Sequence, residues 1–428
     1  MNNVQLVQSK GLRGEITPPP DKSISHRAIM FSALAGGISR VKNFLRAEDP
    51  ISTMNVFRRL GVKIDDNGDE LIIEGKGLTG LSEPFDVLDC GNSGTTMRLI
   101  SGILAGNPFF SVLTGDDSLK QRPMARVIGP LRLMGADISG RSGDKYPPLA
   151  IKGRKLNSIK YKMPVASAQV KSCVMLAGLY AEGITEIIET FKSRDHTERM
   201  LKAMGANIEV EGLSVKVASS ELNAADVIVP GDFSSAAFFI AAALMLPDSE
   251  IMIKNVGMNP TRTGFLDVVK KMGAVVSVEN EREVSGEPVA DLFCKSCDTL
   301  KSVSIGADLM PSLIDEFPIL CVLATQAEGI TEIRGAEELR VKESDRIKTV
   351  AEELRKFGVD LEEFPDGMAV KGRAALKGCS VESHHDHRIA MSMAVAALAA
   401  EGKTIINNAS CADISFPGFF ERLGLLAR

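Results

Sequence analysis

Residues Pro18–Arg27 read PPPDKSISHR and decide how the chain begins to fold. Proline lacks a backbone N–H and disfavours helix at the residue before it, so no helix is expected ahead of Pro20. From Ile24 to Ala35 the apolar residues recur at helical spacing. We therefore expect a helix to begin near Lys22, where free backbone N–H groups, serine hydroxyls and nearby cations favour an anion. The alternative is an ordinary capped helix whose charges are solvated.

The composition is that of a folded protein in which any anion site must be local. The chain has 428 residues, which predicts two or three domains, and 44% are hydrophobic and 25% charged. Its net charge of −5 gives no general reason to bind nucleic acid or an anionic membrane. No apolar run reaches the roughly 18 residues of a membrane span, and Met1–Lys10 has neither signal-peptide nor transit-peptide character. We expect a cytoplasmic protein.

The seven cysteines are scattered and odd in number, which predicts reduced thiols. Cys294 and Cys297 form a CxxC pair, but no second Cys or His pair stands at zinc spacing from it. We expect neither a metal nor a cofactor.

A short phrase recurs along the chain, in which an apolar residue, a glycine and a small apolar residue close a helical segment. Its copies lie about 70 to 85 residues apart and read Leu60-Gly61-Val62, Met134-Gly135-Ala136, Met204-Gly205-Ala206, Met272-Gly273-Ala274 and Phe357-Gly358-Val359, with a degenerate sixth at Leu423-Gly424-Leu425. Each glycine stands where a helix C-cap is expected, and alternating residues after it predict a strand.

A second phrase keeps step with the first and leads from an Ala/Leu-rich helix into a β-rich run. Its six copies begin at Leu34, Leu104, Tyr180, Leu246, Ala327 and Ala400. Two of these regions, Ala181–Ile187 and Ala327–Ile333, both read AEGITEI. We expect a mixed α/β fold of six βαβαββ-like copies, with hairpin turns at Asp65–Asp69 and Phe364–Gly367.

The first helix start of each copy carries small, hydroxylic or charged residues in place of core residues. These starts are Asp21–Ser23, Gly91–Arg98, Ala166–Lys171, Gly231–Ser235, Pro311–Glu316 and His384–Arg388. Further charge stands at the second helix starts, Lys120–Met124, Ser193–Thr197 and Arg340–Arg346. Each alone is typical of a solvated helix cap, but together they indicate a ligand with several negative charges.

Five of these motifs occur in the order found in one family. They are DKSISHR (Asp21–Arg27), GNSGTTMR (Gly91–Arg98), QRPM (Gln121–Met124), RVKESDR (Arg340–Arg346) and DHR (Asp386–Arg388). Over essentially all 428 residues the chain resembles the 5-enolpyruvylshikimate-3-phosphate synthase (3-phosphoshikimate 1-carboxyvinyltransferase) family.

The resemblance implies two domains, each of three βαβαββ units, that close over a cleft. It places the first domain at residues 1–18 plus 236–428 and the second at 21–233, with crossovers near 18–20 and 231–236.

The implied reaction transfers the enolpyruvyl group of phosphoenolpyruvate to the 5-hydroxyl of shikimate 3-phosphate and releases phosphate, in aromatic amino-acid biosynthesis. The substrates bring two phosphates and two carboxylates, which suit the forked donors of arginine. By resemblance, phosphoenolpyruvate is bound by Lys22, Gly94, Arg122, Gln169, Arg346 and Arg388. Shikimate 3-phosphate is bound by Lys22, Ser23, Arg27, Ser167, Gln169, Ser193, Asp315 and Lys342.

The reaction requires that the hydroxyl lose a proton while the alkene methylene gains one, and elimination then reverses both transfers. The family's catalytic candidates match Asp315, Glu343 and Lys22. We assign Asp315 to the 5-hydroxyl proton, and Glu343 together with Lys22 to the methylene proton.

Three positions depart from many family members. Ile414 stands where some have lysine, Ala168 where many have serine, and His196 where many have tyrosine. These departures are similar to the family's second bacterial sequence class. Gly94 lacks the methyl group found in glyphosate-tolerant members, so we expect glyphosate to inhibit.

Other interpretations remain open. His384–His387 could form a metal cluster, although no further ligands follow at fitting spacing. The related UDP-N-acetylglucosamine enolpyruvyl transferases place a reactive Cys or Asp in the loop before Arg-Pro and have Lys-Asn near the start. Here Gly115–Arg122 contains no Cys, and Ser23 follows Lys22. A non-catalytic repeat scaffold would not need charges confined to helix starts. We expect small-molecule substrates, no nucleic acid or membrane partner, and a monomer.

Overall fold

The computed structural model describes residues 2–428, which form two compact units. Residues up to Pro19, Pro230–Glu283 and Pro288–Arg428 form unit 1, and Pro20–Val229 with Val284–Glu287 form unit 2. The chain thus changes unit close to both expected crossovers, whereas no sequence signal indicated that 284–287 would group with unit 2. A division into functional domains at the expected bounds stays a prediction.

Unit 2 contains three copies of the repeat. Its helices are α1 (Lys22–Leu34), α2 (Glu48–Arg59), α3 (Gly94–Ala105), α4 (Ala125–Leu133), α5 (Arg141–Asp144), α6 (Ala168–Gly178) and α7 (His196–Ala203), with a 3₁₀ turn at Leu119–Gln121. Its strands are β3 (Ala35–Lys42), β4 (Lys63–Asp66), β5 (Glu70–Lys76), β6 (Leu88–Asp89), β7 (Phe110–Thr114), β8 (Asp137–Gly140), β9 (Tyr146–Lys152), β10 (Leu156–Asn157), β11 (Lys160–Lys162), β12 (Ala181–Glu182), β13 (Ile184–Ile188), β14 (Ile208–Glu211), β15 (Ser214–Ala218), β16 (Leu222–Asn223) and β17 (Val227–Ile228).

Unit 1 contains the other three copies and both chain ends. Its helices are α8 (Phe233–Met245), α9 (Gly264–Lys271), α10 (Met310–Leu313), α11 (Phe317–Ala324), α12 (Arg346–Lys356), α13 (His387–Ala399) and α14 (Phe419–Leu426), with 3₁₀ turns at Ile314–Glu316, Glu337–Val341 and Ala409–Ile414. Its strands are β1 (Asn3–Val7), β2 (Arg13–Ile16), β18 (Glu250–Gly257), β19 (Val276–Val284), β20 (Glu287–Lys295), β21 (Ser304–Ile305), β22 (Ile330–Ile333), β23 (Leu361–Phe364), β24 (Gly367–Lys371), β25 (Ser380–Glu382) and β26 (Lys403–Asn407).

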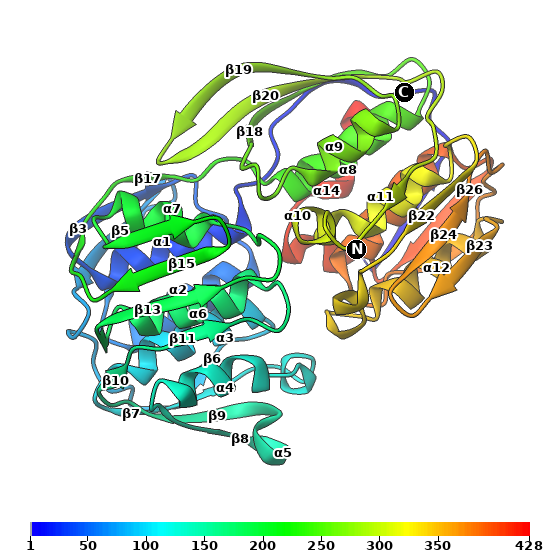
Figure 1. The fold of residues 1–428 in the computed structure, drawn as a ribbon. Helices are drawn as coiled ribbons and strands as arrows, with labels where there is room; N and C mark the ends of the chain where they lie inside the picture. The colour runs from blue at the N-terminus through cyan, green and yellow to red at the C-terminus, as the bar shows by residue number, and fades with distance from the viewer. Residues whose placement is uncertain (1) are drawn as a thin grey trace. The chain divides into compact units, whose positions relative to one another are not determined.

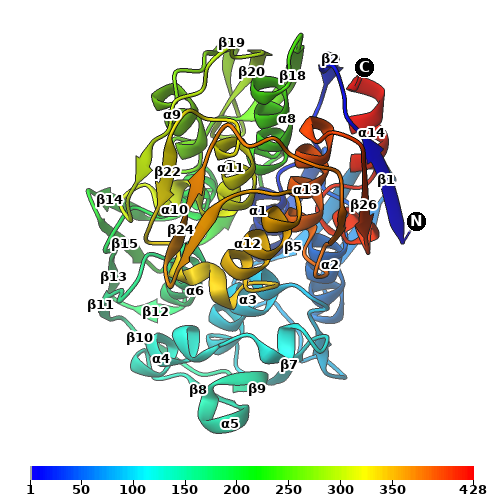
Figure 2. The same ribbon diagram turned by 90° about the vertical axis from the view of Figure 1, so that its right-hand side faces the viewer.

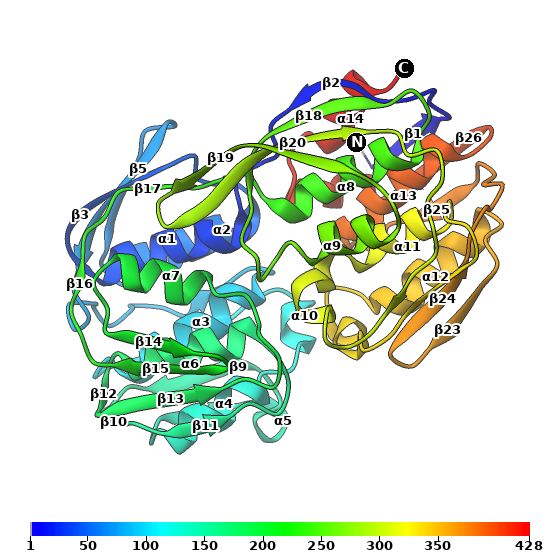
Figure 3. The ribbon, with the colours of Figure 1, turned by 45° about the horizontal axis from the view of Figure 1, so that its top comes forward.

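The sheets repeat one pairing pattern, which confirms the predicted mixed α/β repeat. In the orders β6-β7-β9-β8, β11-β13-β15-β14, β16-β3-β5-β4 and β21-β22-β24-β23, the first pair is parallel and the next two are antiparallel. In unit 1, β18 pairs with β2 in parallel, and β26 pairs with β25 in parallel and with β1 antiparallel. Figure 3 shows the long hairpin of β19 and β20.

Each unit is built around central helices that are buried on nearly every side. In unit 2 these are α1, α3 and α6, and in unit 1 they are α8, α11 and α13. Beyond their first turns their residues are mostly apolar, as α8 with FSSAAFFIAAALM illustrates, and such helices belong in a core. In each unit the central helices pack on one another and on sheets of the repeats (Figure 1).

The chain ends meet within unit 1. Strand β1 lies beside β26 and next to α13, as Figure 2 shows. The backbone N–H of Arg428 donates to the Gly11 carbonyl at 3.1 Å, and the Lys10 N–H donates to the Arg428 carbonyl at 2.8 Å. Residues from opposite ends of the sequence therefore close this unit.

The predicted glycine caps are confirmed in five of the six copies. Gly61, Gly135, Gly205, Gly273 and Gly358 follow helices with φ between +87° and +89°. The sixth prediction was wrong: Gly424 lies inside α14, where the apolar residues of Phe419–Leu426 continue the helix past the glycine. Both predicted hairpin turns are confirmed, between β4 and β5 and between β23 and β24. Among the described residues, none of the helices has the length and apolarity needed to span a membrane.

Gly358 provides a test of the repeated cap, because a Cβ added there would meet nothing within 4 Å. With space available, Gly358→Ala isolates the backbone strain of positive φ and should lower the free energy of unfolding by about 1–2 kcal/mol. Gly358→Asn should lower it less, since Asn tolerates left-handed geometry better. Urea unfolding of the two variants checks the order. If Gly358→Ala is as stable as the unmodified protein, the positive φ of this helix cap does not require glycine and the argument is wrong.

Candidate active site

In unit 2 the central helices start next to one another, and a side chain caps each start. The caps are Asp21, Ser93 and Ser167, each accepting a backbone N–H of the first turn. The Gln169 amide of α6 donates to Thr95 Oγ1 of α3 at 3.0 Å. The starts of α3 and α6 therefore lie side by side, and the free backbone N–H groups of their first turns favour an anion there.

Lys22 is the first residue of α1, and its position is fixed by an acidic partner. Its Nζ lies 3.1 Å from Oδ2 of Asp49, in the first turn of α2. The Lys22 side chain is only 17% exposed. The sequence motif indicates Lys22 but carries no signal for Asp49.

Arg27 ties three helices together. Its Nη1 donates to the Ser23 carbonyl at 2.9 Å, its Nε to Thr197 Oγ1 of α7 at 2.8 Å, and its Nη2 to Ser172 Oγ of α6 at 3.0 Å. Burial lowers the pKa of Arg27 to about 10, although the Glu198 carboxylate acts in the opposite direction. The guanidinium is therefore charged at neutral pH.

Gly94 opens α3 beside two guanidinium groups. A Cβ added there would lie 2.8 Å from Nη1 of Arg98 and 3.7 Å from Nη1 of Arg122. Nη1 of Arg98 also donates to Oε1 of Gln169 at 2.7 Å. The structure thus brings together three predicted residues, Gly94, Arg122 and Gln169, and adds Arg98.

The Arg122 side chain is held by the loops around it. Its Nη1 donates to the Asn92 carbonyl at 3.1 Å, and its Nη2 donates to Asn92 Oδ1 at 2.5 Å and Ser118 Oγ at 3.0 Å. Because Arg122 is only 8% exposed, these bonds fix its orientation before any ligand binds.

The Ser193 hydroxyl is less available to a ligand than the sequence suggested. The residue is 3% exposed, its hydroxyl donates to Glu189 Oε1, and its backbone N–H donates to the same oxygen at 3.0 Å. A phosphate would have to compete with that carboxylate for the Ser193 hydroxyl.

In unit 1, three carboxylates surround the buried guanidinium of Arg346. Nε lies 2.8 Å from Asp386 Oδ2, Nη2 lies 2.6 Å from Glu343 Oε2, and Nη1 lies 3.4 Å from Asp315 Oδ1. Burial alone would lower the pKa of Arg346, but Asp386 and Glu343 outweigh it and raise that pKa. The group is a permanent cation.

Asp315 lies between two arginines. Besides Arg346, the Nη2 of Arg388 lies 3.4 Å from Asp315 Oδ2, and its Nη1 donates to the Asp315 carbonyl at 3.1 Å. Asp386 caps α13 by accepting the Arg388 N–H at 2.9 Å. One carboxylate, Asp386, therefore fixes both Arg346 and the start of α13.

Lys342 lies in the same electrostatic group. Burial lowers the pKa of Lys342, and the carboxylates of Asp315 and Glu343 partly offset that effect. Three cations and three carboxylates, namely Lys342, Arg346, Arg388, Asp315, Glu343 and Asp386, thus lie together in unit 1.

The predicted site residues fall into two groups, one in each unit. Unit 2 holds Lys22, Ser23, Arg27, Gly94, Arg122, Ser167, Gln169 and Ser193, and unit 1 holds Asp315, Lys342, Glu343, Arg346 and Arg388. Sequence analysis missed Asp49, Arg98 and Asp386 as partners. Arg98 closes the GNSGTTMR motif and Asp386 opens DHR, so both lay inside quoted motifs, whereas Asp49 had no signal.

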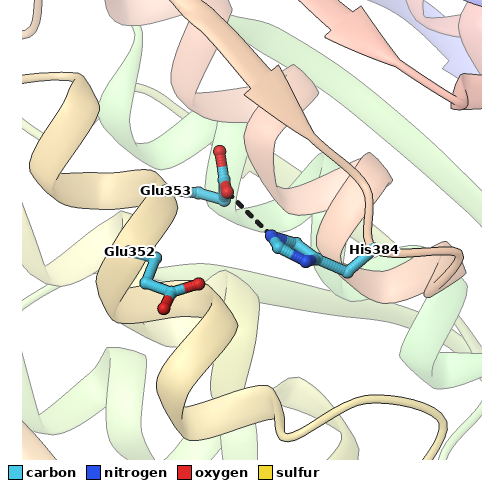
Figure 4. A group of neighbouring side chains, drawn as sticks. All are labelled: Glu352, Glu353 and His384. Carbon is cyan, nitrogen blue, oxygen red and sulfur yellow. Dashed lines mark hydrogen bonds and ion pairs between the residues drawn. The ribbon is translucent and has the colours of Figure 1, made fainter.

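The metal alternative at His384–His387 does not match the arrangement of these side chains. The Asp386 carboxylate is bonded to Arg346, so Asp386 and His384 do not form one set of metal ligands. His384 instead bonds Glu353 at 2.8 Å, with Glu352 near by, as Figure 4 shows. The Lys356 ammonium already donates to both Glu353 oxygens, at 2.9 and 2.7 Å. A cation already occupies the Glu353 carboxylate, so this group is an ion-pair network.

Comparisons with known proteins agree along the whole chain. A curated protein of Thermodesulfovibrio yellowstonii named 3-phosphoshikimate 1-carboxyvinyltransferase is 56% identical over 100% of both chains. One of Bacillus thuringiensis with the same name is 53% identical over 99% of both. The structure of an EPSP synthase from Acinetobacter baumannii is 44% identical, with a TM-score of 0.89 over 99% of this chain and 98% of that one.

A more distant structure shares the fold. The enolpyruvyl transferase NikO from Streptomyces tendae is 18% identical, with a TM-score of 0.79 over 99% of this chain and 96% of that one. Residues 6–423 match the family described as EPSP synthase (3-phosphoshikimate 1-carboxyvinyltransferase). With that match and relatives above 50% identity over the full length, the chain belongs to the EPSP synthase family.

Proposed function

We propose that this protein transfers the enolpyruvyl group of phosphoenolpyruvate to the 5-hydroxyl of shikimate 3-phosphate and releases phosphate. The observation that carries the proposal is the family match over residues 6–423, which includes every motif with a charged helix start. The reaction belongs to aromatic amino-acid biosynthesis. A cytoplasmic location, a monomeric state and membership of the second bacterial sequence class are part of the proposal.

Both groups of site residues contact the substrates in this proposal, and the units serve as the two domains expected at 1–18 plus 236–428 and 21–233. Phosphoenolpyruvate is assigned to Lys22, Gly94, Arg122, Gln169, Arg346 and Arg388. Shikimate 3-phosphate is assigned to Lys22, Ser23, Arg27, Ser167, Gln169, Ser193, Asp315 and Lys342. The cations held near Gly94 and Asp315 support the assignment, since planar guanidinium groups match carboxylate and phosphate oxygens.

The carboxylates supply the proton transfers. In the addition step, Asp315 takes the 5-hydroxyl proton while Glu343, with Lys22, protonates the alkene methylene. The hydroxyl oxygen bonds to the alkene carbon next to that methylene. In the elimination step both transfers are reversed: a proton of the newly formed methyl group returns to the protein, Asp315 gives up the proton that it took, and phosphate leaves with the electrons of the C–O bond. The contacts of Asp315 and Glu343 with Arg346 support these roles by fixing both carboxylates.

An assay of phosphate release with two alternative acceptors tests the proposed function. Mixed with phosphoenolpyruvate and shikimate 3-phosphate, the protein should release inorganic phosphate and form the carboxyvinyl ether. With UDP-N-acetylglucosamine as the acceptor it should release none, because Ser23 follows Lys22 and the loop Gly115–Arg122 has no Cys. Turnover with the sugar nucleotide alone would overturn the proposal, as would the absence of turnover with either acceptor.

The role of Asp315 has its own test. Asp315→Asn keeps the shape of the side chain but cannot accept the hydroxyl proton, so kcat should fall by about 10² or more. Asp360→Asn is the matched control, because Asp360 is exposed and pairs only with Lys371 among the contacts described. Near-normal turnover of Asp315→Asn would reject the assignment.

Glyphosate carries a phosphonate and a carboxylate and should compete with phosphoenolpyruvate. In Gly94→Ala the new methyl group would lie 2.8 Å from Arg98 Nη1 and displace that side chain. The inhibition constant for glyphosate should rise roughly tenfold or more, with a smaller rise in KM for phosphoenolpyruvate. Gly129→Ala is the control, since a Cβ there meets nothing within 4 Å. Inhibition that is equal in both variants would contradict the argument.

A further inference from the structure

One buried charge cluster in unit 2 takes no part in the site as assigned. Lys171 of α6 is fully buried, and its Nζ lies 3.0 Å from Glu189 Oε2 and 2.6 Å from Glu198 Oε1. The same Nζ donates to the Ser193 carbonyl at 3.2 Å. All three donors of the ammonium therefore have an acceptor, as a buried charge requires.

The fold itself does not require a charged residue at the position of Lys171. Lys171 stands four residues after the cap of α6, and the other capped central helices offer a direct comparison. At the same offset from their caps they carry Ser25, Met97, Ala236 and Ala390, all buried and uncharged. Only the α6 copy of this set bears the cost of burying an ammonium and two carboxylates.

The cluster holds the loop that leads into α7. Glu189 follows β13, and its second oxygen, Oε1, accepts both the backbone N–H and the hydroxyl of Ser193. Lys171 bonds the other carboxylate oxygen of Glu189 and also the Ser193 carbonyl. Both polar groups of the Ser193 backbone, its N–H and its carbonyl, are therefore hydrogen-bonded. The conformation of Ser193 therefore depends on this pair of charges.

The cluster also holds Arg27 indirectly. Glu198 lies on α7 next to Thr197, whose hydroxyl accepts from Arg27 Nε at 2.8 Å and hydrogen-bonds Ser172 Oγ at 2.6 Å. The Lys171–Glu198 ion pair thus binds α7 to α6 one residue away from the contacts that orient Arg27. Burial raises the pKa of Glu198, and the Lys171 ammonium opposes that rise.

We propose that Lys171 is a positioning residue that, through Glu189 and Glu198, holds Ser193 and Arg27 in place for shikimate 3-phosphate. The role is selective, because both residues that it holds are assigned to that substrate alone. This inference rests on the proposed function.

The test separates binding of the two substrates. For Lys171→Met, the dissociation constant of shikimate 3-phosphate, measured by calorimetry without phosphoenolpyruvate, should rise on the order of tenfold. The KM for phosphoenolpyruvate should change less than about twofold. Met175→Ala is the matched control, since Met175 is fully buried on the same helix and its truncation loosens packing without touching the charges.

A second variant separates positioning from stability. Lys171→Met leaves two buried carboxylates without their cation, and adding Glu198→Gln removes one of those charges. The double variant should regain part of the melting temperature lost by Lys171→Met, while its binding of shikimate 3-phosphate stays weak. It also serves as the test protein if Lys171→Met does not fold.

The outcomes are distinct. Unchanged binding of shikimate 3-phosphate, equal weakening for both substrates, or the same selective loss in Met175→Ala would overturn the role of Lys171. An unmodified protein that neither binds shikimate 3-phosphate nor releases phosphate would instead overturn the proposed function.

Discussion

The structure depends on one constraint, which is that the central helices of both units are buried along nearly all of their length. A helix that is buried on every side can meet a ligand only through its end. Side chains cap the starts of all these helices except α11, and the residues that follow the caps of α1, α3, α6 and α13 include Lys22, Gly94, Gln169 and Arg388. The first turn of each of these helices therefore has a capped backbone N–H group and also carries a candidate site residue.

Burial gives these charges fixed positions at a cost in stability. Arg346 with Asp386, and Lys171 with its two carboxylates, are out of water, and desolvation of such ions offsets much of their attraction. In return, the donors point in set directions before substrate arrives. Reorganisation at the moment of reaction is thereby avoided.

The sequence was sufficient for the repeat and the fold class, because those features are local, whereas the roles of the candidate residues stay predictions. The glycine caps and the helix starts each need only a few neighbouring residues. Partners that come from elsewhere in the chain were not predictable in that way: Asp49 reaches Lys22 from another helix, and Glu287 reaches His196 Nδ1 at 2.7 Å from 91 residues along the chain. The error at Gly424 has the same origin, since α14 is fixed by its packing rather than by its glycine.

The hydrogen bonds between Arg428 and the segment Lys10–Gly11 set an order for folding during synthesis. Nearly all of unit 2 lies between Pro20 and Val229, so its four sheets can form when about half of the chain has left the ribosome. Unit 1 must wait, because β1 pairs with β26 and the last residue pairs with residues near the first. Strand β1 is thus made before unit 2, whereas its partner β26 is made after all the other strands described.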